Sequence, residues 1–356
     1  MEKKRVVWIE LLRIAACFGV VVLHAASQHF RDVPVDTFVW KVSNFYHGIS
    51  RFAVACFIMI SGALYLDKKR TWNLKKLWLK NILSVAVAYV FWQIFYGIYR
   101  IVITGNSGRG AVWIVKKMLV YVSDAYFHLW YLPMLIGLMI ITPLLWEFVN
   151  CKRGKQWEEY LIILFLIFKI LPYTAAYFPL PWIDHIKTLM NTVQPDLATD
   201  FAGYFILGHY LYEYGLPEKL ERLVYVLGVV FIAGGIGLCQ WKALEQNSAV
   251  QSFYENYTLA AFFWSAAVFL FFRNHIGRIH WSEKKAEIIC YLGGCTFGIY
   301  LIHAFFRDIL HRAGFDSMFI NNTAIAVPVV AAVIFVTSLI AVILIRHIPV
   351  LKKWIV

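Results

Sequence analysis

WIELLRIAACFGVVVLHAAS, residues 8–27, is apolar enough to cross a membrane but carries Glu10, Arg13 and His24. Arg13 and His24 stand eleven residues apart, about three turns of an α-helix, so both side chains leave one face roughly 16 Å apart along the axis. An ionisable residue at the centre of a membrane helix costs on the order of 2.5–3.5 kcal/mol on insertion scales, and such residues usually face a bundle interior or a wet cavity. We therefore expect this face to line the functional site.

The composition of the whole chain is that of an integral membrane protein. Of its 356 residues, 61% are hydrophobic and only 15% are charged, whereas a soluble domain has about 25% charged residues. The net charge of +13 is carried by short basic clusters between apolar stretches. That pattern is typical of membrane topology and excludes nucleic acid as a partner. We expect one all-α, polytopic domain over residues 1–356.

Apolar stretches of about 20 residues are long enough to span the membrane as helices. By this criterion the sequence predicts about ten spans. The two least regular are the sixth, which contains Asp200, His209 and Glu213, and the ninth, which contains Arg307 and Asp308. The predicted ranges are 6–27, 43–66, 78–101, 126–149, 159–178, 197–215, 222–241, 257–273, 290–311 and 324–346.

Lys and Arg alternate with acidic residues from loop to loop. Cytoplasmic loops are enriched in Lys and Arg. The N-terminus and the even-numbered loops, which would lie on the same side of the membrane, are both rich in these residues. Both termini are therefore expected in the cytoplasm. The inner loops carry Lys68, Lys69, Arg70, Lys75 and Lys76, then Lys152, Arg153 and Lys155, then Lys219 and Arg222, then Arg278, Lys284 and Lys285. The outer loops carry Asp32, Asp36, Asp184, Asp196, Glu245 and Glu255.

Two further segments are expected to be helical without crossing the membrane. Gly110–Ser123 has the pattern of an interfacial amphipathic helix. Phe178–Asp196 is the longest outer loop and is a candidate lid over a cavity. The six cysteines form no CxxC pair, so their spacing predicts neither a disulfide framework nor a zinc site.

The polar groups of the first span have both structural and functional interpretations. Glu10 and Arg13 form an i,i+3 pair, which either eases membrane insertion by neutralising itself or holds a cation toward an anionic or carbonyl-bearing ligand. His24 falls about 27 Å into the helix, in the outer half of the membrane. It is either a packed, hydrogen-bonded histidine or a general base, since neutral imidazole accepts a proton near physiological pH.

Other polar residues leave similar alternatives open. Arg51 lies deep enough in the second span to need a carboxylate, backbone carbonyls or a substrate as partner. Ser61-Gly62 is either a small-residue helix contact or part of a substrate site. His128, Trp130 and Tyr131 form either an interfacial aromatic belt or a platform for sugar or lipid. The basic cluster of the second loop anchors the inner face, or it docks a phosphate through Lys69, Arg70, Lys75 and Lys76.

The motifs together resemble the membrane acyltransferase-3 family over essentially the whole chain. Arg13 and His24, ten residues intervening, resemble the first signature of the family, with Glu10 in place of the usual aspartate. FIMISGALY (57–65) is similar to its FFxxSG segment, HLWYLP (128–133) to its WyL motif and FGIYLIH (297–303) to its S-x-YLiH motif. Cys56, Ile58 and Phe297-Gly298 depart from these patterns. The chain looks most similar to stand-alone surface-polysaccharide O-acetyltransferases.

The resemblance implies an enzyme of the bacterial inner membrane. It would transfer an acyl group, expected to be acetyl, from acyl-CoA on the cytoplasmic side to a hydroxyl of a cell-surface or lipid-linked carbohydrate. The catalytic residues would be His24, Arg13 and Glu10. His24 would serve as general base or transient acyl carrier, and Arg13, held by Glu10, would position the donor. Arg13 or Arg51 would stabilise the oxyanion. Lys69, Arg70, Lys75 and Lys76, with Arg51, would bind acetyl-CoA. Substrate would contact Ser61, Trp130, Tyr131, Tyr300 and His303. A homodimer in contact with membrane lipid is compatible with this reading.

Two other functions are compatible with buried charges. A transporter or flippase for a glycan precursor or small anion would also place charged residues along its route. Such proteins often carry inverted repeats and helices broken at matching positions, and we find no such symmetry. A scaffold subunit of a glycan-assembly complex would leave the shared face of Arg13 and His24 unexplained.

Overall fold

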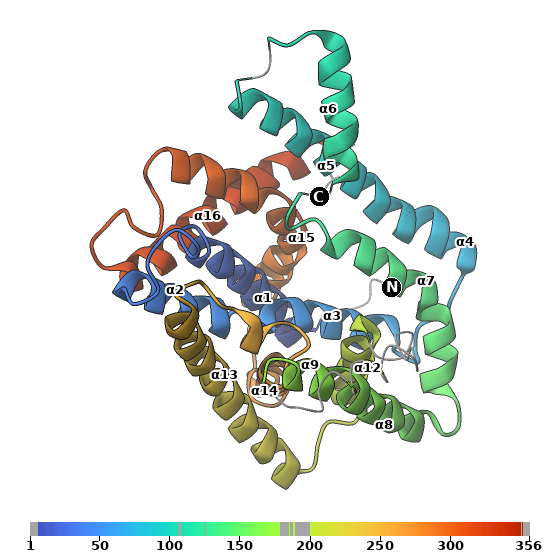
Figure 1. Ribbon diagram of the computed structural model, residues 1–356. Helices are drawn as coiled ribbons and strands as arrows, with labels where there is room; N and C mark the ends of the chain where they lie inside the picture. The colour runs from blue at the N-terminus through green and yellow to red at the C-terminus, as the bar shows by residue number, and fades with distance from the viewer. Residues whose placement is uncertain are drawn as a thin grey trace.

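The computed structural model describes residues 6–105, 108–124, 126–178, 185, 188, 200–349 and 351. Within these residues the regular structure is helical, without a strand. Figure 1 shows the helices gathered around α1 (Val7–Ala26), which covers nearly all of the apolar stretch at residues 8–27. The expectation of an all-α protein is confirmed.

Eight helical segments in the described residues are long and apolar enough to cross a membrane, and the chain is a multi-pass membrane protein. They coincide with eight of the ten ranges expected from the sequence. The exact number of spans and the cytoplasmic side of both termini stay predictions. The eight segments are Val7–Ala26, Phe38–Tyr65, Leu74–Ile103, Tyr131–Asn150, Glu218–Gln246, Ser252–Arg278, Glu283–Arg312 and Thr323–Arg346.

The fifth and sixth expected spans are helical but are not among these eight. The fifth is one uninterrupted helical run made of α8 (Gly154–Phe165), a π-helical segment (Leu166–Ile170) and α9 (Leu171–Ala175), and it carries Lys155, Glu158, Glu159 and Lys169. The sixth is α12 (Phe201–Glu213), whose 13 residues extend about 20 Å. That is shorter than the roughly 30 Å hydrocarbon core of a bilayer. Helix α12 instead packs within the protein, against α3 and α8.

The second expected span consists of two helices. Helix α2 (Phe38–Ile49) begins at Thr37, whose hydroxyl accepts the Trp40 N–H at 3.3 Å, the usual role of threonine at a helix N-terminus. Helix α3 (Phe52–Tyr65) follows after a break at Ser50 and Arg51. The break places Arg51 at the start of α3 instead of inside a continuous helix.

Close helix approaches at glycines hold the centre of the bundle together. A Cβ on Gly62 of α3 would lie 1.7 Å from the Phe205 carbonyl oxygen of α12, and one on Gly208 would lie 2.1 Å from the Met59 carbonyl oxygen. These two backbones are therefore in direct contact, as small residues allow between membrane helices. The structural interpretation of Gly62 is confirmed.

Helix α15 (Glu283–Arg312) and helix α16 (Thr323–Arg346) pack beside α1 and bring the C-terminal third of the chain to the N-terminal helix. Helix α13 (Glu218–Gln246) packs on α14 (Leu259–Asn274), which in turn contacts α3. Helix α7 (Tyr131–Asn150) follows the HLWYLP motif and contacts α3, α5 and α8. Four segments distant in the sequence, α1, α3, α7 and α15, thus surround one region.

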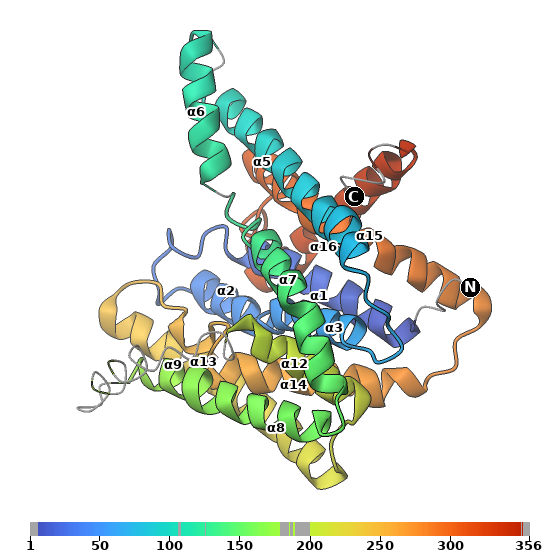
Figure 2. The same ribbon diagram turned by 90° about the vertical axis from the view of Figure 1, so that its right-hand side faces the viewer.

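A helical hairpin projects from the rest of the bundle (Figure 2). It consists of α5 (Leu83–Ile103), preceded by the short α4 (Leu74–Lys76) and a π-helical segment (Leu77–Ile82), and of α6 (Ala111–Ser123). The helix expected over Gly110–Ser123 is confirmed, and it packs on α5. Its Val112 and Leu119 are 71% and 68% exposed, so an apolar face is left outside the protein, as a helix in contact with lipid requires.

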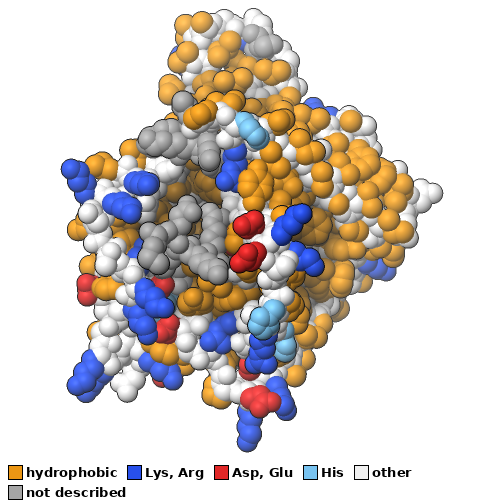
Figure 3. All heavy atoms as spheres, turned by 180° about the vertical axis from the view of Figure 1, so that it is seen from behind, with side chains coloured by type: hydrophobic (Ala, Val, Ile, Leu, Met, Phe, Trp, Pro, Cys, Tyr) orange, Lys and Arg blue, Asp and Glu red, His pale blue; other side chains and the backbone are white. Residues whose placement is uncertain are grey.

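The outer surface is largely apolar. Seen from behind, hydrophobic side chains cover the upper and right-hand parts, and charged side chains gather toward the left and lower parts (Figure 3). Leu144 on α7 and Leu344 on α16 are 75% and 64% exposed. A surface this apolar is the one expected against lipid.

The contact between α3 and α12 makes a prediction about stability. Gly62→Ala should lower the melting temperature in detergent, because the added Cβ would clash with the Phe205 carbonyl oxygen and overpacking costs about 1–3 kcal/mol. The matched control is Gly137→Ala in α7, where nothing lies within 4 Å of the added Cβ. Equal melting temperatures for the two variants would contradict the close approach.

Candidate functional site

A cavity of about 170 Å³ lies among α1, α3, α15 and the segment that leads into α7. Arg13 and His24 both line it, so the two groups share one wall as their eleven-residue spacing predicts. The cavity also brings together four of the five expected substrate residues, all except His303. Its lining is Arg13, Val20, His24, Val54, Phe57, Ser61, His128, Trp130, Tyr131, Leu135, Thr296, Phe297 and Tyr300.

Arg13 and Glu10 form a short-range ion pair at one end of this lining. Arg13 Nη1 donates to both carboxylate oxygens of Glu10, at 3.1 and 3.0 Å. Glu10 is buried, whereas the Arg13 side chain is 24% exposed. Within the described residues only Nη1 of Arg13 is hydrogen-bonded, which leaves Nη2 and Nε available to a ligand. The pair therefore neutralises a buried carboxylate and also points a cation into the cavity.

Helix α15 approaches the Glu10–Arg13 pair closely because residue 293 is glycine. A Cβ at Gly293 would lie 2.2 Å from Glu10 Oε2. The carboxylate thus occupies the space that any other side chain would fill. Packing against Gly293 of α15 therefore fixes the Glu10 carboxylate, and the ion pair with Glu10 fixes the Arg13 guanidinium.

Three histidine rings meet at the His24 end of the cavity. The His24 and His303 rings are stacked with centroids 5.3 Å apart, and the His303 and His128 centroids are 5.0 Å apart. The three come from α1, α15 and the HLWYLP segment. His303 is fully buried and does not line the cavity itself.

Backbone hydrogen bonds define the protonation pattern of two of these rings. His303 Nδ1 lies 2.7 Å from the Tyr300 carbonyl oxygen and His128 Nε2 lies 3.3 Å from the Leu301 carbonyl oxygen. A carbonyl only accepts, so both nitrogens carry a proton. The remaining nitrogens, His303 Nε2 and His128 Nδ1, are buried with no hydrogen-bond partner in the described structure. In neutral rings these nitrogens are proton acceptors.

Arg307 is a cation beside the three histidines. Its guanidinium lies 4.8 Å from the centroid of the Phe127 ring, which is itself 5.0 Å from the His24 ring. It is also close enough to act electrostatically on all three imidazoles. The sequence analysis assigned no role to Arg307, and it placed His128 in an aromatic belt or platform instead of beside His24. The available signal was the four-residue spacing of His303 and Arg307, which places them on one face of α15.

The expected substrate residues make a polar and aromatic wall. Tyr131 hydrogen-bonds to the Ser61 side chain, and the Tyr300 hydroxyl donates to the His128 carbonyl oxygen. Trp130 packs on Phe201 with centroids 5.6 Å apart. The wall offers apolar ring faces with a few hydroxyls, a composition typical of small-molecule sites.

The basic loop after α3 lies outside the cavity lining but reaches toward Arg13. The Arg70 guanidinium is stacked between the Tyr65 and Trp72 rings, 4.2 and 4.6 Å from their centroids. Tyr65 is within electrostatic reach of both Arg70 and Arg13. Lys69, Lys75 and Lys76 are exposed. Tyr65 therefore links the basic loop to the Arg13 end of the cavity.

Arg51 does not join the other expected cofactor residues. It precedes α3 whereas the basic loop follows it, and the 14 residues of α3 extend about 21 Å. Arg51 instead contacts His47 at 3.1 Å and Gln251 at 3.3 Å, and its guanidinium lies 5.3 Å from the Tyr254 ring centroid. It has the protein partner that its depth requires, and it is not part of the cavity lining. The lid expected over Phe178–Asp196 falls almost wholly outside the described residues.

The roughly 16 Å rise between Arg13 and His24 limits what they can do together. A general base and an oxyanion donor must both lie about 3 Å from the reacting group. Arg13 and His24 are too far apart to act in this way on one carbonyl. Arg13 is placed to bind a remote part of a ligand whose reactive end reaches His24.

The fold and cavity define a multi-pass membrane protein with an internal polar site. A family model described as an acyltransferase domain matches residues 6–347. The chain belongs to this acyltransferase-3 family, as its motifs indicated. No curated protein and no solved structure matches the chain significantly.

The Glu10–Arg13 pair yields a prediction that does not depend on activity. Glu10→Gln should lower the free energy of unfolding by about 1.5–3 kcal/mol, the usual contribution of a hydrogen bond to a charged group. Thermal unfolding in detergent measures the effect. The matched control is Glu218→Gln, which removes a carboxylate from an exposed pair with Arg222 and should change stability by at most about 1 kcal/mol. Equal losses in both variants would contradict a structural role for the buried pair.

Proposed function

We propose that the protein is an acyl-CoA-dependent O-acyltransferase that modifies a cell-surface or lipid-linked carbohydrate at the bacterial inner membrane. The observation that carries this proposal is that Arg13 and His24, about three helical turns apart, line the same cavity. A donor with an anionic head, a narrow arm and a reactive tip suits a site of this shape. Family membership supports the reaction class.

The donor is expected to enter from the Arg13 end. Its phosphates would meet Arg70 and the exposed lysines of the loop after α3, where the positive charges favour an anion. Its arm would pass Tyr65 and Arg13, whose free Nη2 and Nε suit amide or carbonyl oxygens. The thioester would then lie beside His24. We leave Arg51 out of this assignment because it lies at the other end of α3.

His24 would act as general base. It removes the proton of the acceptor hydroxyl while the oxygen attacks the thioester carbonyl. Collapse of the tetrahedral intermediate breaks the C–S bond, and the departing CoA thiolate takes up the proton. In a two-step alternative the imidazole accepts the acyl group first and then passes it to the hydroxyl. His303 stacks on His24 and would position its ring in either route.

The candidate for stabilising the developing oxyanion is Arg307, which lies against Phe127 beside the His24 ring but outside the cavity lining. Arg13 is about three helical turns from His24, whereas Arg307 is within electrostatic reach of the His24 ring. We therefore assign oxyanion stabilisation to Arg307 and donor positioning to Arg13. Trp130, Tyr131 and Tyr300 would contact the sugar, because aromatic faces and hydroxyls suit its apolar and polar surfaces.

The histidine assignment is tested with purified protein in detergent, acetyl-CoA labelled in its acetyl group, and lipid-linked glycan extracted from the host membrane as the acceptor. His24→Gln should lower kcat by about 10²–10⁴-fold, the usual contribution of general base catalysis. Arg13→Gln should mainly raise the KM for acetyl-CoA. His275→Gln, an exposed histidine on the surface, is the control. A His24→Gln protein with near-normal turnover would rule out the assignment.

The same assay separates enzyme from transporter. Consumption of acetyl-CoA in detergent, where no gradient exists, is expected for the enzyme only. Mass spectrometry of the host's surface polysaccharide, with and without the gene, should show a difference of one acyl group. An unchanged glycan and no CoA release in detergent would overturn the proposed function.

A separate prediction concerns Arg307. Arg307→Gln should lower kcat by about 10²–10³-fold, as loss of one oxyanion donor does, with the KM for acetyl-CoA little changed. The control is Arg312→Gln, five residues further along the same helix, where the side chain is 52% exposed and bonded to Asp308. Equal kcat values for the two variants would contradict the oxyanion role.

A further inference from the structure

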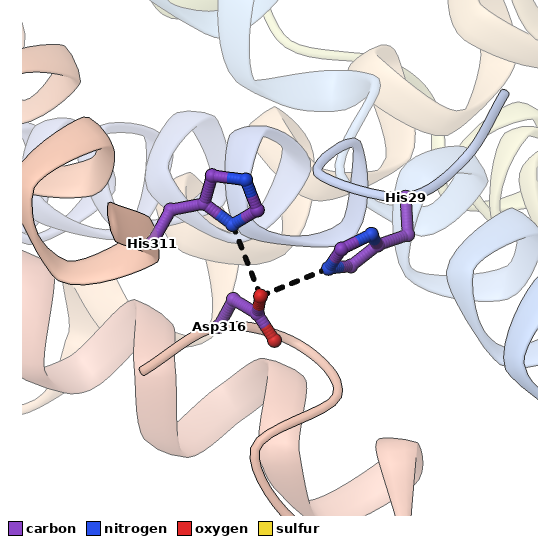
Figure 4. Close-up of side chains that lie close together, drawn as sticks. All are labelled: His29, His311 and Asp316. Atoms are coloured by element: carbon purple, nitrogen blue, oxygen red, sulfur yellow. Dashed lines mark hydrogen bonds and ion pairs between the residues drawn. The ribbon is translucent and has the colours of Figure 1, made fainter. Parts of the chain in front are cut away.

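Outside the cavity, two histidines and an aspartate converge where α1 and α15 end (Figure 4). His29 comes from the turn after α1, His311 from the last turn of α15, and Asp316 from the loop between α15 and α16. In Figure 4 both imidazoles point toward the carboxylate. Two imidazole nitrogens and one carboxylate oxygen thus lie close together, although the residues are up to 287 positions apart in the sequence.

The distances suit a shared metal ion. Asp316 Oδ2 lies 3.0 Å from His29 Nε2 and 3.0 Å from His311 Nδ1, and the ligand atoms all lie within 4.8 Å of one another. Tetrahedral zinc with bonds of about 2.0–2.1 Å holds its ligands roughly 3.4 Å apart. The observed cluster therefore needs only small side-chain rotations to surround an ion.

The carboxylate is oriented by the backbone. Asp316 Oδ1 accepts the Met318 N–H at 2.8 Å. This hydrogen bond leaves Oδ2 facing the two imidazoles, 3.0 Å from a nitrogen of each ring.

The surroundings are compatible with a cation. The neighbouring Arg312 donates to Asp308 at 3.0 Å instead of to Asp316. The His29, His311 and Asp316 side chains are 20%, 40% and 14% exposed, so solvent reaches the cluster and a water molecule can complete the coordination. Two imidazole nitrogens favour zinc or a similar transition metal over Mg²⁺ and Ca²⁺, which prefer oxygen ligands.

We propose that His29, His311 and Asp316 bind one divalent transition-metal ion, of the Zn²⁺ type, with water as the remaining ligand. The ion joins the end of α1 to the end of α15. His29 lies five residues beyond His24, and His311 lies eight residues beyond His303. The ion thus clamps together the two helices that carry the stacked histidines of the cavity. The cysteine spacing could not reveal this site because no cysteine contributes to it.

Metal content tests the proposal directly. The protein, purified with a tag that lacks histidine, is treated with a chelator, dialysed against micromolar Zn²⁺ and then against metal-free buffer, and analysed by plasma mass spectrometry. We expect about one zinc per chain in the wild-type protein. His29→Gln and Asp316→Asn should lose that zinc. His275→Gln and His280→Gln, which alter exposed histidines elsewhere, should retain it.

Two further measurements on the wild-type protein keep the test decisive if a variant does not fold. Zn²⁺ should raise the melting temperature of the chelator-treated protein, because an ion that binds only the folded state stabilises it. Zinc X-ray absorption should show nitrogen and oxygen ligands at about 2.0–2.1 Å. No retained zinc, equal zinc in the His29→Gln protein, or sulfur ligands at about 2.3 Å would each overturn the proposal.

Discussion

The architecture depends on placing a carboxylate and a guanidinium inside an apolar helix. Glu10 is buried, and a buried charge without a partner costs several kcal/mol. Arg13 supplies that partner one turn away at 3.0 Å, and Gly293 leaves the space in which the carboxylate sits. The packing of α1 on α15 and the direction of the Arg13 side chain therefore follow from one ion pair. The His24–His303 stack lies further along the same two helices.

Helix periodicity explains what the sequence could predict. The positions of Arg13 and His24 on one wall follow from three turns of a regular helix, and the small-residue contact at Gly62 follows from its lack of a Cβ. Eight spans follow from length and apolarity alone. Segments that depend on tertiary contacts were less accessible, since α12 is too short to cross a bilayer unaided but is buried by α3 and α8.

The functional site also contains some residues that the sequence predicts and others that only tertiary contacts bring together. His128 and Arg307 come together with His24 only in the folded chain. The four-residue spacing of His303 and Arg307 placed both on one face of α15 but did not show what that face contacts. Arg51 was grouped with the basic loop as part of one acetyl-CoA site, but the break before α3 and the length of α3 separate them. The cluster of His29, His311 and Asp316 likewise depends on two loops that meet in three dimensions.

The proposed enzyme requires one cavity to hold a donor that extends from Arg13 to His24. The most direct measurement is a cryo-electron microscopy structure with a non-transferable thioether analogue of acetyl-CoA. Our account predicts density for the arm beside Arg13 and for the acyl end within hydrogen-bonding distance of the His24 ring. An analogue bound elsewhere, or a cavity filled by side chains between Arg13 and His24, would contradict it.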